Sequence, residues 1–311
     1  MENLQGKTAF ITGGASGIGL GIAKAAGKAG MKLVIADIRQ SVVDETVKYF
    51  EGEGVPVLGL QLDITDRESF VRAADSAEAR FGNIHLLVNN AGIGVNGKPL
   101  WGYTYKDIDF MVSVNITGIL NGIVTIVPRM LAHGEEGHVL STASMNGLAV
   151  FAGTGLYSAT KQAVVGMMET LADDLCGTKI GASAFCPGPI MTNLGQTTDE
   201  VRPEALRNEG ERKPGGPPPL KPGVKIPDFG KFMMTIEECG ERVIRGVRRG
   251  DLYITTHAIF REGVRARAEA MVRAFPLDPV DQELFEDLKA FGHQVYNPVY
   301  DTQKQVPPFE K

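Results

Sequence analysis

The sequence predicts an α/β fold in which a doubly wound parallel sheet is flanked by helices. Short apolar segments recur along the chain between longer segments with helical periodicity, and such uninterrupted apolar runs are typical of parallel strands buried on both faces. Glycine is abundant, with 38 residues among 311, which suits the tight strand–helix connections of this class. We therefore expect one dinucleotide-binding and catalytic domain over residues 1–311.

The order of the expected elements supports this class. Strands are expected at 7–12, 32–37, 55–62, 85–89, 138–142, 180–186 and 251–255. Helices are expected at 18–29, 65–81, 105–131, 155–177, 235–249, 260–275 and 279–291. Thr65 and Thr235 each precede a glutamate at capping-box spacing, and Asp278 before Pro279 suits a helix N-terminus. Right-handed crossovers then give a Rossmann-like sheet that binds ligands at the carboxyl ends of its strands.

Residues 193–232 interrupt this pattern. The part from 202 to 227 contains seven prolines and four glycines. A disordered linker is one interpretation; a lid over a substrate pocket is the other, and the position directly after strand 180–186 favours the lid. Residues 256–311 form a C-terminal helical extension whose polar end, from 297 onward, is expected to be loose.

Composition argues against several classes of function. A net charge of −5 provides no basic surface for nucleic acid. Three widely spaced cysteines without a CxxC pair fit a reducing compartment, so we expect a cytoplasmic protein. The five histidines are scattered, so no metal site is expected. The N-terminus lacks a signal-peptide pattern, and no apolar run approaches the about 20 residues that span a membrane.

The first strand leads into a glycine-rich turn, TGGASGIG at 12–19, which opens a helix. Glycine lets the backbone turn sharply and approach a pyrophosphate, whose charge the helix N-terminus stabilises. The candidate cofactor residues here are Gly13, Ser16, Gly17, Ile18 and Gly19. A tight turn without a ligand is the alternative interpretation.

Asp37 ends the second strand, next to Ile38. A carboxylate at this place accepts hydrogen bonds from the ribose hydroxyls of an adenosine and repels a 2′-phosphate, which favours NAD over NADP. Arg39 lies two residues further on and would weaken that discrimination. A loop-capping role for Asp37 is the alternative.

Tyr157 and Lys161 are four residues apart, so a helix places both on one face. A phenol titrates near ~10, and a neighbouring ammonium is expected to lower that pKa, which would let the pair exchange a proton with an alcohol or carbonyl oxygen. Ser144 lies two residues after the expected strand 138–142, and its hydroxyl can hydrogen-bond the same oxygen. Ser141 and Thr142 are alternative candidates for that role. The alternative interpretation of Ser144 is a purely structural one, in which it caps a helix or forms a Ser/Thr turn.

Together with NNAG at 89–92, Asn115 and PGPIMT at 187–192, these motifs resemble the short-chain dehydrogenase/reductase family over residues 5–195. The resemblance implies that Asp63 and Ile64 contact adenine and that Asn115 completes a catalytic tetrad by holding a water behind Lys161. It assigns the cofactor wall to Asn89, Ala91 and Gly92, and the nicotinamide to Pro187, Gly188, Ile190 and Thr192. It also implies a homodimer or homotetramer joined through helices 105–131 and 155–177.

A closer similarity is to the bacterial Cα-dehydrogenases, which oxidise the benzylic alcohol of lignin β-aryl ethers. The similarity rests on four segments: ADIR at 36–39, PRM at 128–130, the long insert, and LYI at 252–254. It implies an NAD-dependent enzyme for bulky aromatic alcohols. The apolar residues that suit an aromatic pocket, or alternatively an ordinary core, are Met145, Leu148, Phe151, Met191, Leu194, Phe229 and Phe232.

Three other functions compete with this prediction. An NADPH-dependent ketoreductase, or a sugar or steroid dehydrogenase, would use the same catalytic residues. A non-catalytic dinucleotide-binding regulator would share only the fold. A serine hydrolase is disfavoured, because Ser144 has no G-x-S-x-G elbow and His138 lies within a strand.

Overall fold

The computed structural model describes residues 1–95, 97–210, 228–293 and 295–309. It confirms the predicted fold class, because seven parallel strands form one sheet in the order β3-β2-β1-β4-β5-β6-β7. The strands are β1 (Thr8–Thr12), β2 (Lys32–Asp37), β3 (Val57–Gln61), β4 (Leu86–Asn89), β5 (Gly137–Thr142), β6 (Ile180–Cys186) and β7 (Tyr253–Thr255). The strand order reverses between β1 and β4, and a crevice at that point is where such sheets bind ligands.

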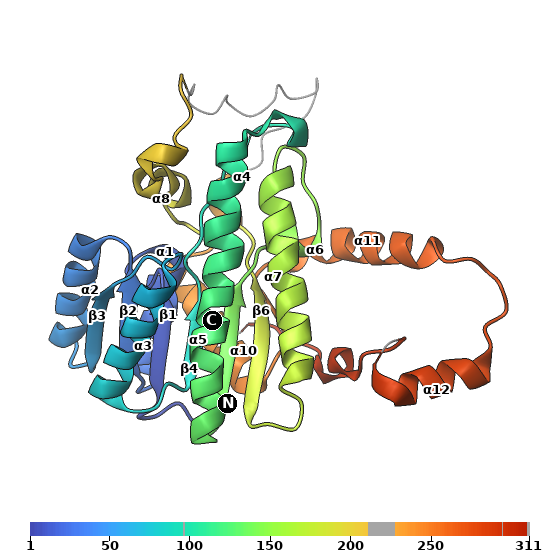
Figure 1. Cartoon of the computed structure of the whole chain (residues 1–311), viewed down its shortest axis with the longest axis horizontal. Helices are drawn as coiled ribbons and strands as arrows, with labels where there is room; N and C mark the ends of the chain where they lie inside the picture. Colours follow the sequence, from blue (N-terminus) through green and yellow to red (C-terminus); the bar gives the residue numbers. More distant parts are fainter. Residues whose placement is uncertain (96, 211–227, 294, 310–311) are drawn as a thin grey trace.

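Helices cover both faces of the sheet (Figure 1). One layer consists of α1 (Gly17–Lys28), α2 (Gln40–Gly52) and α10 (Ile236–Arg249). The other consists of α3 (Arg67–Phe81), α5 (Gly118–His133) and α7 (Gly155–Asp174). In the first layer α1 and α10 lie almost backbone to backbone, since a Cβ on Gly240 would fall 2.0 Å from the carbonyl oxygen of Gly21.

The structure corrects several local predictions. Helix α2 was not expected, because its segment is mostly polar and only Val43, Thr46 and Phe50 are buried. Asp66, rather than Thr65, caps α3 by accepting a hydrogen bond from the Ser69 N–H at 3.1 Å. Thr235 caps α10 as predicted, with the Glu238 N–H at 3.2 Å.

The expected helix 105–131 is divided into two. Helix α4 (Tyr105–Val112) and α5 are joined by a π-helical turn, Ser113–Thr117. The run Tyr105–His133 is long enough to cross a membrane, and its most apolar 18-residue part is hydrophobic enough, by length and composition alone, but half of that part is buried in the domain. That burial is typical of a helix packed in a protein core.

The insert contains more regular structure than its composition indicates, and the C-terminal extension contains the two predicted helices. The insert holds α8 (Leu194–Val201), a 3₁₀ turn (Glu204–Leu206) and α9 (Phe229–Phe232), while 211–227 lie outside the described residues. The extension holds α11 (Arg261–Arg273) and α12 (Gln282–Gly292), and Asp281 rather than Asp278 caps the latter. The last part was expected to be loose, but Val299 is buried and Gln303 accepts a hydrogen bond from the Tyr253 N–H at 2.7 Å.

Candidate functional site

A cavity of about 700 Å³ lies at the carboxyl edge of the sheet, within the range typical of small-molecule and cofactor sites. The predicted residues in its wall are Gly13, Ser16, Gly17, Ile18, Asp37, Ile38, Asp63, Ile64, Ala91, Gly92, Tyr157, Lys161, Pro187, Met191, Thr192 and Leu194. The predicted residues that are not part of that wall are Gly19, Asn89, Asn115, Ser144, Met145, Phe151, Gly188 and Ile190. The turns after β1, β2, β4, β5 and β6 meet here because parallel strands end at one edge.

The glycine-rich turn has the geometry that only glycine allows. Gly13 and Gly17 have φ of +61° and +51°, a backbone region that favours glycine. A Cβ on Gly19 would lie 2.1 Å from the Gly13 carbonyl oxygen. The N-terminus of α1 therefore packs directly behind the turn, and its backbone N–H groups are available to an anion in the cavity.

Asn90, which sequence reasoning left without a role, fastens this turn to the neighbouring strands. Its Nδ2 donates to the carbonyl oxygens of Thr12 and Gly13 at 3.1 and 3.2 Å, and its Oδ1 accepts from the Thr142 hydroxyl at 3.2 Å. Asn89 is buried within the sheet, where its Nδ2 donates to Ser141 Oγ at 3.4 Å. The sequence carries no signal for which of two adjacent asparagines faces the cavity.

Asp37 and Arg39 lie together at the end of β2. The Asp37 Oδ1 accepts hydrogen bonds from the backbone N–H and from Nε of Arg39, both at 3.2 Å. The same guanidinium donates through Nη2 to Ser16 Oγ at 2.8 Å, and its Nη1 lies 3.6 Å from Glu200 of α8. A carboxylate, which suits ribose hydroxyls, and a guanidinium, which suits a phosphate, thus lie side by side.

Tyr157 and Lys161 lie on one face of α7, as predicted. Lys161 is buried, with its Nζ donating to the Thr142 carbonyl oxygen at 2.9 Å and lying 5.6 Å from the centroid of the Tyr157 ring. The Tyr157 phenol interacts with the Ser144 hydroxyl, and Ser144 Oγ accepts a hydrogen bond from the Asn146 N–H at 3.2 Å. Ser144 caps the short helix α6 (Met145–Leu148). The structure therefore brings the three predicted side chains together.

The electrostatics of this group differ from the prediction. Burial raises the pKa of Tyr157, and the hydrogen bond with Ser144 only partly opposes it. Burial also lowers the pKa of Lys161 to about 8. The expected lowering of the phenol pKa by its neighbour is wrong for this structure, because desolvation of the charged form outweighs it. The phenol is consequently protonated near neutral pH.

Asn115 lies in the π-helical turn and is fully buried. Its Oδ1 accepts from the Ile93 N–H and its Nδ2 donates to the Ile93 carbonyl oxygen, both at 2.9 Å. A Cβ on Gly92 would lie 3.3 Å from Asn115 Oδ1 and 3.5 Å from Lys161 Nζ. Asn115 therefore lies next to Lys161 and clamps the loop after β4; π turns are often found at functional sites.

One end of the cavity is apolar. Its lining there consists of Ile93, Phe110, Val114, Met191, Leu194, Val201 and Leu206. Sequence reasoning found only Met191 and Leu194, since Val201 and Leu206 lie in the irregular insert. Met145 is buried in the core, with its N–H donating to the Pro187 carbonyl oxygen at 2.9 Å. The side chain of Phe229 lies outside the described residues.

Four aromatic side chains from three segments pack against the segment that follows β6. Phe151 lies 5.9 Å from Phe260, and Phe232 lies 5.8 Å from Phe260 and 5.4 Å from His257, measured between ring centroids. A Cβ on Gly188 would lie 2.6 Å from His257 Nδ1 and 2.9 Å from Phe260. Gly188 therefore permits this aromatic cluster, defined as Phe151, Phe232, His257 and Phe260, to approach the cavity from outside.

A buried ion network holds the first part of the insert on α4. Asp107 is fully buried; its Oδ1 accepts from Arg202 Nη2 at 2.7 Å and from Asn208 Nδ2 at 2.9 Å, and its Oδ2 accepts from Lys98 Nζ at 3.1 Å. These donors hold the pKa of Asp107 well below its usual range. The Arg202 guanidinium also lies 5.4 Å from the Phe110 ring centroid. Residues 194–208 are thus attached beside the apolar end of the cavity.

No metal centre is seen in the part of the chain that the structure describes. Among those residues, no three His, Cys, Asp or Glu side chains are grouped so that they could hold an ion.

Comparisons with known proteins agree with this geometry. The short chain dehydrogenase family matches residues 7–203. A C alpha-dehydrogenase of Sphingobium sp. strain SYK-6 is 37% identical over 273 residues, which are 88% of this chain and 87% of that protein.

Two solved structures also superpose closely. A short chain dehydrogenase/reductase from Burkholderia phymatum in complex with NAD has a TM-score of 0.78 at 32% identity, over 90% of this chain and 100% of that one. The apo form of LigD from Sphingobium sp. strain SYK-6 has a TM-score of 0.72 at 34% identity, over 89% and 100% of the two chains. Since the family match spans more than half of the sequence, the chain belongs to the short chain dehydrogenase family and is an oxidoreductase.

Proposed function

We propose that this protein uses NAD to interconvert a bulky aromatic secondary alcohol, such as a lignin-derived benzylic β-aryl ether, and its ketone. The observation that carries this proposal is the placement of Tyr157 and Lys161 in the wall of a 700 Å³ cavity with an apolar end, with Ser144 next to the Tyr157 phenol. The three unpaired cysteines suit a reducing compartment such as the cytoplasm.

The residues present fit a dinucleotide. The glycines of the turn leave little space for a side chain, because a Cβ on Gly13 would lie 2.9 Å from the Ala91 Cα and one on Gly17 would lie 3.3 Å from Thr192. This turn would hold the pyrophosphate, Asp37 the adenosine ribose, and Lys161 and Thr192 the nicotinamide side. Asp37 favours NAD, since its carboxylate already neutralises Arg39, and the Burkholderia phymatum relative was solved with NAD.

A bound NAD⁺ would supply the hydride acceptor for oxidation of the carbinol carbon. Tyr157 handles the proton: the neutral phenol donates it to the ketone oxygen in reduction, and the phenolate accepts it from the alcohol in oxidation. The raised Tyr157 pKa suits the neutral donor. The Ser144 hydroxyl donates to the same oxygen and holds it in place. Lys161, with a pKa of about 8, exchanges protons readily near neutrality and can resupply the phenol.

Aromatic substrates are favoured by the apolar lining of the cavity. Phe110, Val201 and Leu206 offer a polyol no hydrogen-bonding side chains, so a sugar there would leave hydroxyl groups unpaired. Rings from a bulky aromatic alcohol would instead bury apolar surface. The similarity to a C alpha-dehydrogenase supports the same class of substrate.

The test is turnover by the purified protein with NAD⁺ or NADP⁺, followed by reduced-nicotinamide absorbance. The panel contains a benzylic β-aryl ether alcohol, a sterol and a sugar alcohol. We expect activity with NAD⁺ and the aryl alcohol. Tyr157→Phe should lower kcat roughly 10²–10⁴-fold, whereas the matched variant Tyr49→Phe, on exposed α2 surface, should retain wild-type activity.

Other outcomes favour the competing functions. A preference for NADP⁺ or for the sterol indicates the NADPH-dependent or steroid alternative, for which Arg39 is the supporting residue. Cofactor binding without turnover of any alcohol or ketone indicates a regulator. Near-wild-type turnover by Tyr157→Phe contradicts the proposed mechanism.

A further inference from the structure

The segment that follows β6 is held from two distant parts of the chain. We define the nicotinamide segment as residues 187–192, since it contains the residues that the family resemblance assigns to the nicotinamide. The last part of the insert pairs with its backbone: the Met234 N–H donates to the Pro189 carbonyl oxygen at 3.1 Å, and the Met191 N–H donates to the Met234 carbonyl oxygen at 2.9 Å. The second part that holds this segment follows β7.

A chain of hydrogen bonds begins at Gly188 in this segment. The Gly188 N–H donates to Thr256 Oγ1 at 2.8 Å. Thr256 Oγ1 lies 2.7 Å from His257 Nδ1, and His257 Nε2 lies 2.9 Å from the Phe232 carbonyl oxygen. Phe232 ends α9, two residues before Met234. The hydrogen-bond chain therefore connects the nicotinamide segment with the end of the insert.

The chemistry of the groups fixes the direction of each bond. The Phe232 carbonyl oxygen can only accept, so His257 Nε2 carries the hydrogen. Burial lowers the pKa of His257 below its ordinary value of 6.5, so the imidazole is neutral at pH 7 and its bare Nδ1 accepts from the Thr256 hydroxyl. The oxygen of that hydroxyl accepts from the Gly188 N–H. Each group in the hydrogen-bond chain thus has the partner that it requires.

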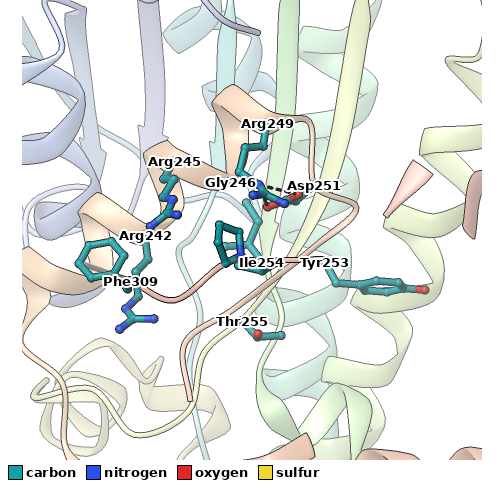
Figure 2. Close-up of a pocket in the computed structure, with 11 residues that line it drawn as sticks. Arg242, Arg245, Gly246, Arg249, Asp251, Tyr253, Ile254, Thr255 and Phe309 are labelled. Atoms are coloured by element: carbon teal, nitrogen blue, oxygen red, sulfur yellow. Dashed lines mark hydrogen bonds and ion pairs between the residues drawn. The ribbon is translucent and has the colours of Figure 1, made fainter. Parts of the chain in front are cut away.

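The edge strand β7 gives Thr256 a fixed place. Thr256 is buried, and the preceding residue, Thr255, pairs with Cys186 at the end of β6. Figure 2 shows Ile254 beside Gly246 of α10, and a Cβ on Gly246 would lie 2.5 Å from Ile254 Cδ1. Because β7 is packed closely against β6 and α10, it holds Thr256 at the carboxyl edge of the sheet, where the nicotinamide segment begins.

The His257 ring is enclosed as well as hydrogen-bonded. Its centroid lies 5.4 Å from that of Phe232 and 6.3 Å from that of Phe260. Its Nδ1 lies so near the backbone of Gly188 that a Cβ there would be 2.6 Å away. These contacts oppose rotation of the imidazole, so its two nitrogens keep their partners.

We propose that Thr256 and His257 are positioning residues that set the place of the nicotinamide in this oxidoreductase. Neither side chain lies in the cavity wall, so both act through the nicotinamide segment. Thr256 holds the Gly188 N–H, and His257 joins Thr256 to the end of the insert, so the two sides of the nicotinamide segment are fixed together. The inference rests on the proposed NAD site. It concerns the nicotinamide end of that site and not the adenosine end at Asp37.

The first experiment titrates NAD⁺ and ADP separately into the free protein by calorimetry. Thr256→Val keeps the shape of the side chain but leaves the buried Gly188 N–H without an acceptor, so we expect the Kd for NAD⁺ to rise about 10-fold. The Kd for ADP should stay unchanged, because ADP has no nicotinamide. Thr256→Ser keeps the hydroxyl and should bind NAD⁺ as the wild type does.

The matched control is Thr178→Val. The Thr178 hydroxyl also accepts from a backbone N–H, that of Ile180 at 3.1 Å, but at the opposite end of β6. Both affinities should be unchanged in this variant. Equal losses of NAD⁺ and ADP affinity in Thr256→Val, or no loss of either, overturn the inference alone. A wild type that binds no NAD⁺ contradicts the proposed NAD site, and the inference with it.

The second experiment tests the link between Thr256 and His257. His257→Phe keeps a ring in the aromatic cluster but loses both hydrogen bonds. The double variant His257→Phe/Thr256→Val should bind NAD⁺ no more weakly than the weaker single variant, because both changes break one hydrogen-bond chain. A loss equal to the product of the two single losses overturns the link.

The tautomer of His257 provides a test that needs no cofactor. Imidazole nitrogen NMR of the free protein at pH 7 should show a protonated Nε2 and an unprotonated Nδ1, in signals that disappear in His257→Phe. The opposite tautomer overturns the hydrogen-bond chain, since Nδ1 would then not accept from Thr256.

Discussion

The Lys161 ammonium lies 2.9 Å from the carbonyl oxygen of Thr142 and 5.6 Å from the centroid of the Tyr157 ring. It is 3% exposed, and neither of those neighbours is a negative charge. Burial of a cation without a nearby anion is unfavourable, which is why the pKa of Lys161 falls to about 8. The residue proposed to assist catalysis should therefore reduce the stability of the free protein.

Replacement of Lys161 by methionine should stabilise the free protein at neutral pH while lowering turnover. The folded-state pKa is about 8, against an ordinary value of 10.5, so the unfolded state binds more protons between these values. The free energy of unfolding of the wild type thus rises as the pH increases from 8 to 10.5. Below pH 8, burial of the charged Lys161 lowers that free energy by its full amount, about 3 kcal/mol. Melting temperatures of both proteins at pH 7 and pH 10 check this. A difference of equal size at both pH values contradicts it.

Acid should destabilise the protein through His138. This side chain is buried in β5 with Nε2 2.7 Å from Ser183 Oγ, and burial lowers its pKa to about 3. Because the unfolded histidine titrates near 6.5, the unfolded state binds more protons below that pH. Because of His138, the free energy of unfolding should fall by up to about 1.4 kcal/mol for each pH unit as the pH decreases from 6 to 3.

The measurement for His138 is urea unfolding over this pH range. His138→Asn should show a shallower loss of stability with acid than the wild type. The control His293→Asn, at an exposed position, should keep the wild-type slope. Identical slopes for His138→Asn and the wild type would count against buried His138 as the cause.

Loss of the ion pair between Arg202 and Asp107 should detach the first part of the insert. Arg202→Met leaves the buried carboxylate with fewer donors, at a cost of about 3–5 kcal/mol. We expect a raised KM for the alcohol with a smaller change in kcat, and faster proteolysis within 194–210. The matched control Arg207→Met removes two exposed contacts, the pair with Glu204 and a hydrogen bond to the Asp199 carbonyl oxygen at 3.1 Å, and should change KM little. An unchanged KM for Arg202→Met would refute this role.

Cofactor preference should depend on Asp37. Asp37→Ala removes the charge that repels a 2′-phosphate and releases the Arg39 guanidinium, which it now binds through Nε at 3.2 Å. We expect kcat/KM for NADP⁺ relative to NAD⁺ to rise about 10–100-fold, the effect of 1–3 kcal/mol. Arg39→Met should change NAD⁺ use little. Steady-state kinetics with both cofactors decides between these outcomes, and an unaltered ratio for Asp37→Ala contradicts the assignment.

The sequence by itself determined the strand pattern, the glycine-rich turn and the pairing of Tyr157 with Lys161 on one helix. These features depend on residues a few positions apart, because strand and helix periodicity and turn chemistry are local. Local signals failed where neighbouring residues could both cap a helix: Asp66 and Asp281 are the N-caps, where Thr65 and Asp278 were expected. Helix α2 was not predicted, because its polar segment has too few apolar positions to show helical periodicity.

Only the tertiary structure decided how distant segments meet. Arg202 reaches Asp107 across 95 residues of sequence, and the choice between Asn89 and Asn90 depends on how β4 packs between β1 and β5. The raised pKa of Tyr157 arises in the same way, because desolvation comes from all the elements around a side chain. No spacing in the sequence encodes that enclosure, since burial and long-range contacts depend on the packing of whole layers.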